Sequence, residues 1–257
     1  MNLPPIIQSI SRRLKRWVPI GKSPLIDRNA LLVSLYHAKK DFFFLQIGAN
    51  DGFSNDPIYS FITQQSPTGL LIEPQPEVFQ KLEKTYPTKE FPNLRLINIA
   101  IGVENGSLTL YKIAPSFETT YREHYKPTAN PSGITSIHKE HVKSFLLKVM
   151  PTYFRNHDIE QVIETVSVPA KTIDSLLEEE NVTNLDFVQI DTEGFDAKIV
   201  HMLLGSHLIN NPKIINFETK NLPTSERKEI YECLISHGYT LHEVKGDTFS
   251  IHQSCQF

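Results

Sequence analysis

Residues 42–59 read FFFLQIGANDGFSNDPIY, and this stretch decides the fold. It opens with six residues that are apolar except for Gln46. A short, aromatic apolar run that stops at a glycine indicates a strand buried on both faces rather than a helix. The turn GANDG follows, and Asp56 and Pro57 then predict a helix start, because Asp can cap backbone N–H groups and Pro is tolerated at the first helical position.

Strand, glycine turn and helix is the arrangement in which a nucleotide-like ligand approaches bare backbone beside a helix N-terminus. The alternative is a tight turn that needs its glycines and binds nothing, because a lone glycine turn is a weak signal.

The rest of the chain repeats this unit. Short apolar runs alternate with stretches of helical spacing, and the runs end at Glu73, Ile99, Asp191 and Glu218. Such alternation predicts right-handed crossovers and an α/β fold with a parallel, doubly wound sheet. Two further strand patterns flank the turn at 245–247, a hairpin signal. We therefore expect a mostly parallel sheet with a C-terminal antiparallel hairpin.

Two segments depart from the repeat. Residues 1–40 are predicted to be a helical extension before a larger domain at 41–257, and the rhythm of that domain breaks at about 114–163. Long irregular segments inside compact domains are often lids or binding loops. We expect an insertion that recognises the substrate. Its many aromatic residues would either stack on a sugar ring or pack a subdomain.

Residues 4–18 have the pattern of an amphipathic helix. Trp17 and several isoleucines fall on one arc, Arg12 and Lys15 fall opposite, and residues 1–26 contain no acidic residue. A basic helix with such an apolar face is typical of peripheral contact with an anionic membrane surface. The alternative is a helix that docks on its own domain or on a partner subunit, which is the commoner use of an apolar stripe.

Composition narrows the class of protein. The length of 257 residues suits one large α/β domain, of which 40% of the residues are hydrophobic and 21% charged. The formal net charge of −3 argues against a general nucleic-acid binder, which usually has an excess of basic residues. Cys233 and Cys255 are too far apart for a CxxC or zinc pattern and indicate a reducing compartment. No apolar run of about 18 residues and no signal peptide are visible, so we expect a cytoplasmic protein, with any membrane association at its surface.

Ligands in an open α/β sheet bind outside the carboxyl ends of the strands. Glu73 lies 21 residues beyond Gly52, the separation that lets a carboxylate bind both ribose hydroxyls. The turn lacks the third glycine of GxGxxG and has no basic residue, so a pyrophosphate does not fit. S-adenosylmethionine, an adenosine ligand without phosphate, fits better. The predicted cofactor contacts are Gln46, Gly48, Ala49, Asn50, Asp51, Gly52, Glu73, Pro74, Asn98, Ala100 and Asp191.

Seven motifs occur in a fixed order along residues 42–220: QIGANDG, LIEP, INIAIG, SGITSIH, TIDSL, QIDTEGF and INFE. In this order they resemble the FkbM family of S-adenosylmethionine-dependent methyltransferases. The resemblance implies a class I, Rossmann-like methyltransferase fold at 41–257. It also implies O-methylation of a hydroxyl, often on a sugar, glycolipid or polyketide. Gln46 departs from many class I sequences, which place an acidic residue there near the amino group of the cofactor; Asp51 would supply that charge instead.

Methyl transfer to a sugar hydroxyl needs a base, because the hydroxyl has a high pKa. The candidates are Glu193, His138 and Glu218. The resemblance places Asp191 and Glu193 at the methyl-transfer face, and with Glu218 they could also hold Mg²⁺, which prefers hard oxygen ligands. The alternatives are that Glu193 and Glu218 bond backbone and helix ends, and that His138 is simply packed or solvated.

Other functions remain as alternatives. The chain could be a non-catalytic binding module that keeps the fold, or a nucleotide-dependent oxidoreductase, which the missing GxGxxG disfavours. A DNA or RNA methyltransferase would often carry an Asn/Asp-Pro-Pro-aromatic element, whereas Asp191-Thr192-Glu193-Gly194 stands in that place. The expected partner is therefore a small-molecule or glycan acceptor and not a nucleic acid.

Overall fold

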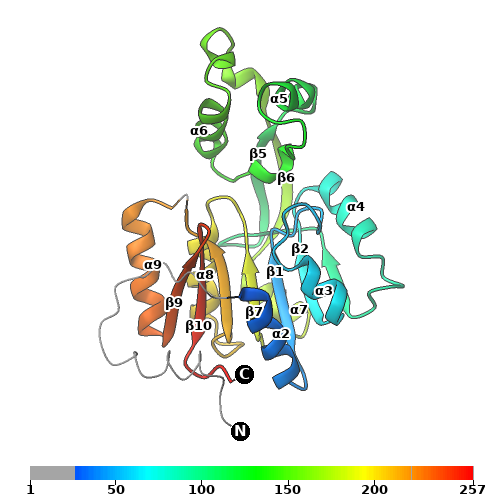
Figure 1. Cartoon of the computed structure of the whole chain (residues 1–257), viewed down its shortest axis with the longest axis vertical. Coiled ribbons are helices and arrows are strands. Elements are labelled where there is room, and N and C mark those ends of the chain that lie inside the picture. The colour runs from blue at the N-terminus through cyan, green and yellow to red at the C-terminus, as the bar shows by residue number, and fades with distance from the viewer. Residues whose placement is uncertain (1–26, 221, 257) are drawn as a thin grey trace.

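A seven-stranded sheet with the order β3-β2-β1-β7-β8-β10-β9 forms the centre of the computed structural model, which describes residues 27–220 and 222–256 (Figure 1). The strands from β3 to β8 run parallel, and β10 pairs antiparallel with both β8 and β9. The predicted parallel sheet with a C-terminal antiparallel hairpin is confirmed. The strands are β1 (Phe43–Ile47), β2 (Thr68–Ile72), β3 (Leu94–Ile97), β7 (Phe187–Ile190), β8 (Ile214–Glu218), β9 (Tyr239–Val244) and β10 (Asp247–His252).

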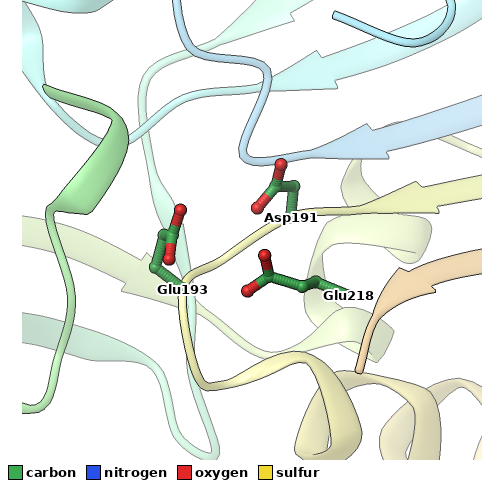
Figure 2. A group of neighbouring side chains, drawn as sticks. All are labelled: Asp191, Glu193 and Glu218. Atoms are coloured by element: carbon green, nitrogen blue, oxygen red, sulfur yellow. The ribbon is translucent and has the colours of Figure 1, made fainter. Parts of the chain in front are cut away.

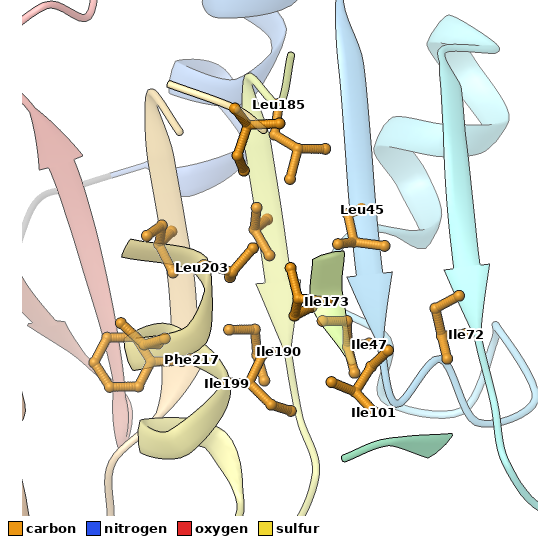
Figure 3. Packing of buried hydrophobic residues seen from close by; sticks show 14 of the residues in the cluster. Leu45, Ile47, Ile72, Ile101, Ile173, Leu185, Ile190, Ile199, Leu203 and Phe217 are labelled. Carbon is orange, nitrogen blue, oxygen red and sulfur yellow. The ribbon is translucent and has the colours of Figure 1, made fainter. Parts of the chain in front are cut away.

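Helices cover both faces of this sheet. Successive strand residues point to opposite faces, so Leu45 and Ile47 belong to one apolar cluster and Phe44 to the other. The first cluster includes residues of α7 and α8 (Figure 3) and of α9, and the second includes residues of α2, α3 and α4. The helices are α2 (Arg28–Ala38), α3 (Tyr59–Gln65), α4 (Pro76–Thr85), α7 (Ile173–Glu179), α8 (Asp196–Gly205) and α9 (Thr224–Ser236).

A second sheet carries the predicted insertion. Its three strands have the order β4-β6-β5, with bounds Ala100–Ile101, Ile163–Lys171 and Gly106–Ile113. Strands β5 and β6 pair antiparallel along their length and hold residues 114–162, which we call the arm, at their far end (Figure 1). The arm contains α5 (Glu118–His124), α6 (Lys139–Val149) and 3₁₀ turns at Pro115–Phe117, Pro131–Ile134, Tyr153–Arg155 and Ile159–Val162.

The arm has an apolar cluster of its own. Phe117 and Tyr121 are buried in it against Val142 and Leu146 of α6. Of the two roles considered for the aromatic residues of this segment, these two therefore pack a subdomain.

One local prediction changes. The helix expected at Asp56 and Pro57 begins at Tyr59, because the Asp56 carboxylate accepts the Ile58 N–H at 2.9 Å and so closes a separate turn before the helix.

The N-terminal segment is only partly described. The amphipathic helix expected at 4–18 lies outside the described residues. Helix α2, from the end of the predicted extension, buries Leu32 and Leu35 in the core of the α/β domain. None of the described helices is long and apolar enough to cross a membrane.

Candidate active site

A cavity of about 390 Å³ opens at the carboxyl ends of β1, β2, β7 and β8. This size suits a small-molecule or cofactor site. Its walls come from the glycine turn after β1, the segment 72–75, strand β4, the loop after β7, the end of β8, and the arm segment 132–137. The edge of the sheet at which the sequence predicts ligand binding therefore holds the cavity.

The turn after β1 forms one wall. Gly48 has φ +80°, and a Cβ atom there would lie 1.8 Å from the carbonyl oxygen of Asp191. Only glycine fits, because the turn passes directly against the chain that leaves β7. The N–H groups of Gly48 and Ala49 both donate to the Ile72 carbonyl at 2.9 Å. These contacts fix Gly48, Ala49 and Asn50 along the cavity.

Glu73 follows β2 and is buried, with its carboxylate in the cavity wall. One oxygen accepts the Asn50 N–H at 2.9 Å, and the other accepts the Gln75 N–H at 2.9 Å. Burial raises the pKa of Glu73 to about 7, although these hydrogen bonds oppose the rise. Pro74 and Ala100 line the same part of the cavity.

Three predicted cofactor residues do not line the cavity. Asn98 instead donates to the carbonyl oxygens of Glu73 and Pro74, at 2.7 and 3.1 Å, and so fixes the end of β2. The carbonyl of Gly52 accepts the hydroxyl of Tyr86, on which Gly52 packs.

Asp51 is the third. Burial alone would raise its pKa, but hydrogen bonds from Ser54 and Phe53 lower it below the usual value. Its carboxylate accepts the Ser54 N–H at 2.7 Å and is turned into its own loop. Asp51 is therefore not placed to supply the charge that Gln46 lacks, whereas Gln46 itself and Asp56 do line the cavity.

Asp191, Glu193 and Glu218 all line the cavity, and their side chains point toward one another (Figure 2). One carboxylate oxygen from each lies within 4.8 Å of the others. The Asp191 side chain is open to the cavity, but protein encloses it otherwise. This burial, with the charges of the neighbouring carboxylates, raises its pKa well above the usual value. The sequence prediction that these three acids meet is confirmed.

The loop after β7 is held in an unusual conformation. Glu193 has φ +52° and Gly194 has φ +112°, a strained geometry for a residue with a side chain. Asp196, at the start of α8, accepts the hydroxyl of Thr192 at 2.8 Å and the N–H of Glu218 at 3.3 Å. Burial raises the pKa of Asp196 to about 6. Asp196 was not among the residues predicted from the sequence, although an acid in the first turn of the helix after DTEGF is a visible signal.

The arm places the rings of His138 and His141 beside this loop at Gly194, and the histidine that bonds Glu193 is not His138. The N–H of His138 donates to the Ser136 hydroxyl at the start of α6, and its ring does not line the cavity. Three residues later, Nε2 of His141 lies 3.0 Å from a carboxylate oxygen of Glu193. The hydrogen bond to Glu193 raises the pKa of His141. Ser136 donates to the Glu193 carbonyl at 2.7 Å, so the arm contacts the backbone of Glu193 as well as its carboxylate.

Two other contacts complete the walls. Lys220, which sequence reasoning did not single out, forms an ion pair with Glu218. Gln75 accepts the Thr135 hydroxyl at 2.9 Å, so the arm segment also contacts the chain after β2.

The family model of the methyltransferase FkbM domain matches residues 46–241. A search of curated proteins found no match. Among solved structures, the N-terminal domain of human METTL16 is 10% identical, with a TM-score of 0.43, and the alignment covers 93% of this chain and 72% of that chain. The precorrin-6y C5,15-methyltransferase from Geobacter metallireducens GS-15 is 11% identical, with a TM-score of 0.39, and the alignment covers 91% and 90%.

These structural similarities are too low to indicate a substrate. The family match, in contrast, spans every strand end that borders the cavity. The chain belongs to the FkbM methyltransferase family and is an S-adenosylmethionine-dependent methyltransferase of the class I fold.

Proposed function

We propose that the chain transfers the methyl group of S-adenosylmethionine to a hydroxyl oxygen of a sugar, a glycolipid or a related natural product. The observation that carries this proposal is the carboxylate group of Glu193, which faces the cavity beside Asp191 and Glu218 and is paired with His141. A hydroxyl acceptor needs a base, and a carboxylate within the cavity can provide it.

The cavity suggests how the cofactor would lie. The ribose hydroxyls would meet Glu73, and the amino-acid end would lie along the turn at Gly48. The sulfonium would then point toward the acidic end of the cavity, where negative charge favours a cation. The acceptor would enter between the loop after β7 and the arm segment 132–136.

The transfer is an in-line displacement. The acceptor oxygen attacks the methyl carbon, the bond between this carbon and sulfur breaks, and the sulfonium becomes the neutral thioether of S-adenosylhomocysteine. The hydroxyl proton passes to the Glu193 carboxylate. Alignment of oxygen and methyl group contributes most of the acceleration, and the contacts from Ser136 and His141 would hold Glu193 in position for it.

The same carboxylates have the oxygen donors that Mg²⁺ prefers, and bound Mg²⁺ would polarise the acceptor hydroxyl. Glu193 and Glu218 already pair with His141 and Lys220, however, and Mg²⁺ would compete with both cations. We therefore assign the carboxylates to acceptor binding and proton transfer. Activity that exhaustive chelation abolishes and Mg²⁺ restores would overturn this assignment.

The decisive experiment follows the methyl group. Cell extracts incubated with the protein and radiolabelled S-adenosylmethionine should yield a labelled product in which the methyl group is an ether on a hydroxyl oxygen. A Glu193→Gln variant should transfer label at least about 100-fold more slowly, by loss of the base, with unchanged cofactor affinity. Label on nitrogen or carbon would contradict the hydroxyl assignment.

Peripheral membrane contact through residues 4–18 and a cytoplasmic location belong to the same proposal, because a glycolipid acceptor would be met at a membrane surface. Co-sedimentation with anionic vesicles should be stronger for the full chain than for a chain that starts at Leu25. Equal pelleting of both would contradict the membrane contact.

A further inference from the structure

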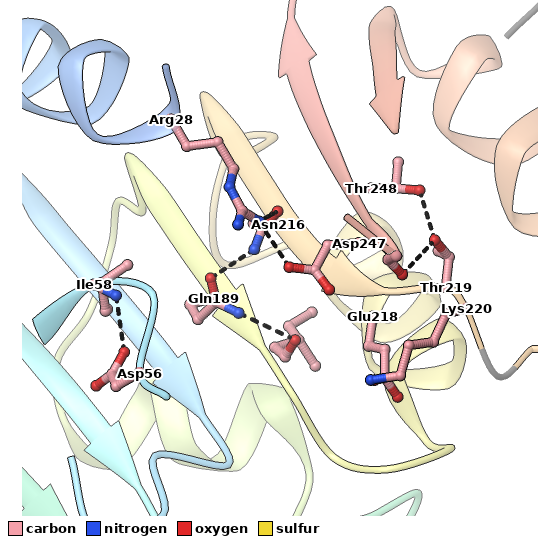
Figure 4. A network of polar contacts seen from close by, with 12 residues as sticks. Arg28, Asp56, Ile58, Gln189, Asn216, Glu218, Thr219, Lys220, Asp247 and Thr248 are labelled. Atoms are coloured by element: carbon pink, nitrogen blue, oxygen red, sulfur yellow. Dashed lines mark hydrogen bonds and ion pairs between the residues drawn. The ribbon is translucent and has the colours of Figure 1, made fainter. Parts of the chain in front are cut away.

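Three buried amide side chains form a row across the central sheet. Gln46, Gln189 and Asn216 are direct partners on β1, β7 and β8, and each is at most 3% exposed. The Asn216 amide donates to the Gln189 carbonyl oxygen at 2.8 Å. Arg28 continues the row and donates to Asp247 at 2.7 Å (Figure 4). At this end, the polar groups of the row have protein partners.

The other end of the row differs. The side-chain oxygen of Gln46 is buried in the cavity wall, and no donor in the described residues reaches it. Buried polar atoms are nearly always hydrogen-bonded, because an unpaired one loses the free energy of its bonds to water. An unpaired oxygen at a cavity wall therefore indicates a ligand that donates to it.

Asp56 lines the same cavity and has a second buried oxygen that is unpaired within the described residues. Its Oδ1 accepts the Ile58 N–H at 2.9 Å (Figure 4), but no donor within the described residues reaches its buried Oδ2. Burial raises the pKa of Asp56 to about 6, although hydrogen bonding from the Ile58 N–H and, to a smaller extent, from the Gln46 side chain opposes this rise. A cation bound at Oδ2 would stabilise the charged carboxylate and so offset the free energy that its burial costs.

The two oxygens define the chemistry of their ligand. Both are acceptors, and one belongs to a carboxylate, so the complementary group is a cation with several N–H donors. A primary ammonium has three donors and no acceptor. Gln46 and Asp56 lie in the cavity with the turn at Gly48, along which the amino-acid end of the cofactor is proposed to lie.

We propose that Asp56 and Gln46 bind the α-ammonium group of the methionine part of S-adenosylmethionine and of its product. This inference rests on the proposed placement of the cofactor. Asp56 thus takes the role that an acidic residue at the end of β1 has in many class I sequences, and the uncharged Gln46 shares the ammonium with it.

Calorimetric titration with two ligands tests the inference. S-adenosylhomocysteine carries the ammonium, whereas 5′-methylthioadenosine has the same adenosine and sulfur but no amino-acid end. An Asp56→Asn variant should bind S-adenosylhomocysteine roughly 10- to 100-fold more weakly than the wild type, because a charge-assisted contact is lost. Its affinity for 5′-methylthioadenosine should stay within about twofold.

Two variants serve as controls. Glu73→Gln should weaken both ligands alike, because both contain the ribose. Asp51→Asn changes the same residue type in the same loop, but its carboxylate is bonded to Ser54 outside the cavity wall. It should leave the ratio of the two affinities unchanged. Thermal unfolding without ligand confirms that each variant is folded.

The outcomes distinguish an error in the placement of the cofactor from an error in the ammonium contact. If the wild type binds neither ligand, the placement of the cofactor is wrong. If the wild type binds both ligands, but Asp56→Asn leaves S-adenosylhomocysteine affinity unchanged or weakens both ligands equally, the ammonium contact alone is wrong.

Discussion

The two halves of the same parallel strands differ sharply in character. In the middle of the sheet, Leu45, Val188 and Ile215 are completely buried among other aliphatic side chains. A few residues further along, strands of the same sheet end in carboxylates, among them Glu73 and Glu218. The apolar half gains free energy from burial, whereas at the carboxyl edge burial raises the pKa values of Glu73 and Asp191. The stability of the sheet interior therefore supports a carboxyl edge whose buried acids cost stability but serve the chemistry.

The largest effect should come from the apolar half. Leu45→Ala should lower the free energy of unfolding by roughly 2–5 kcal/mol, because it leaves a cavity in a fully packed layer. The remaining folded protein should bind S-adenosylhomocysteine as before. Urea unfolding and titration measure the two quantities. Leu147→Ala is the matched control; Leu147 is 47% exposed on the arm and should cost less than about 1 kcal/mol. Equal losses in both variants would remove the contrast.

The next effect concerns the carboxyl edge, where replacing a residue should remove a loss of stability instead of causing one. Because the pKa of Glu73 is raised from 4.5 to about 7, the folded state binds an extra proton between these values, and its stability falls as the pH rises through this window. From pH 4 to pH 8 the ligand-free wild type should lose about 3 kcal/mol more than Glu73→Gln. Denaturant unfolding across this range measures the difference. Parallel pH profiles of the two proteins would show that Glu73 titrates normally.

A smaller effect tests how the arm serves the edge. His141→Gln should lower kcat roughly 10- to 100-fold with little change in the KM for S-adenosylmethionine, because Glu193 loses its partner and its alignment. The acidic limb of the pH–rate profile should also move. His138→Gln is the matched control and should change kcat less than about threefold, since its ring lies outside the cavity wall. The reverse ranking would restore His138 as the catalytic histidine.

The smallest effect should come from surface charge on the β5–β6 ribbon. Lys112 forms ion pairs with Glu77 and with Glu164, the latter at 3.3 Å. Lys112→Met should cost no more than about 1 kcal/mol, because both carboxylate partners are exposed to solvent and Met keeps the aliphatic packing of the lysine side chain. The cost should shrink further at high salt. Thermal unfolding at two salt concentrations measures it, and a loss comparable to that of Leu45→Ala would contradict the comparison.

Much of the central sheet, and of the edge where its parallel strands end, could be predicted from the sequence. Apolar periodicity placed the strands to within a few residues, and the rule that parallel strands end at one edge brought Asp191, Glu193 and Glu218 together. Family resemblance added the methyltransferase family to the parallel sheet and the phosphate-free adenosine ligand that the motifs already predicted.

The rest depends on where side chains point in irregular segments. Asp51 and Asp56 lie in the same loop, and only the local turns decide that the carboxylate of the second faces the cavity. Likewise, the start of α6 turns His141 rather than His138 toward Glu193. Neither choice follows from spacing or composition.

The attachment of the arm has a consequence for how this enzyme can change. Ile113 and Ile163, which flank the arm, are paired neighbours on β5 and β6. The arm therefore begins and ends at the same place, the end of the β5–β6 ribbon. A segment of different length can therefore replace the arm in evolution without displacing the strands that carry Gly48 and Glu73. Because arm segment 132–137 lines the cavity and Ser136 bonds the Glu193 backbone, a replacement segment would also have to complete this wall of the site.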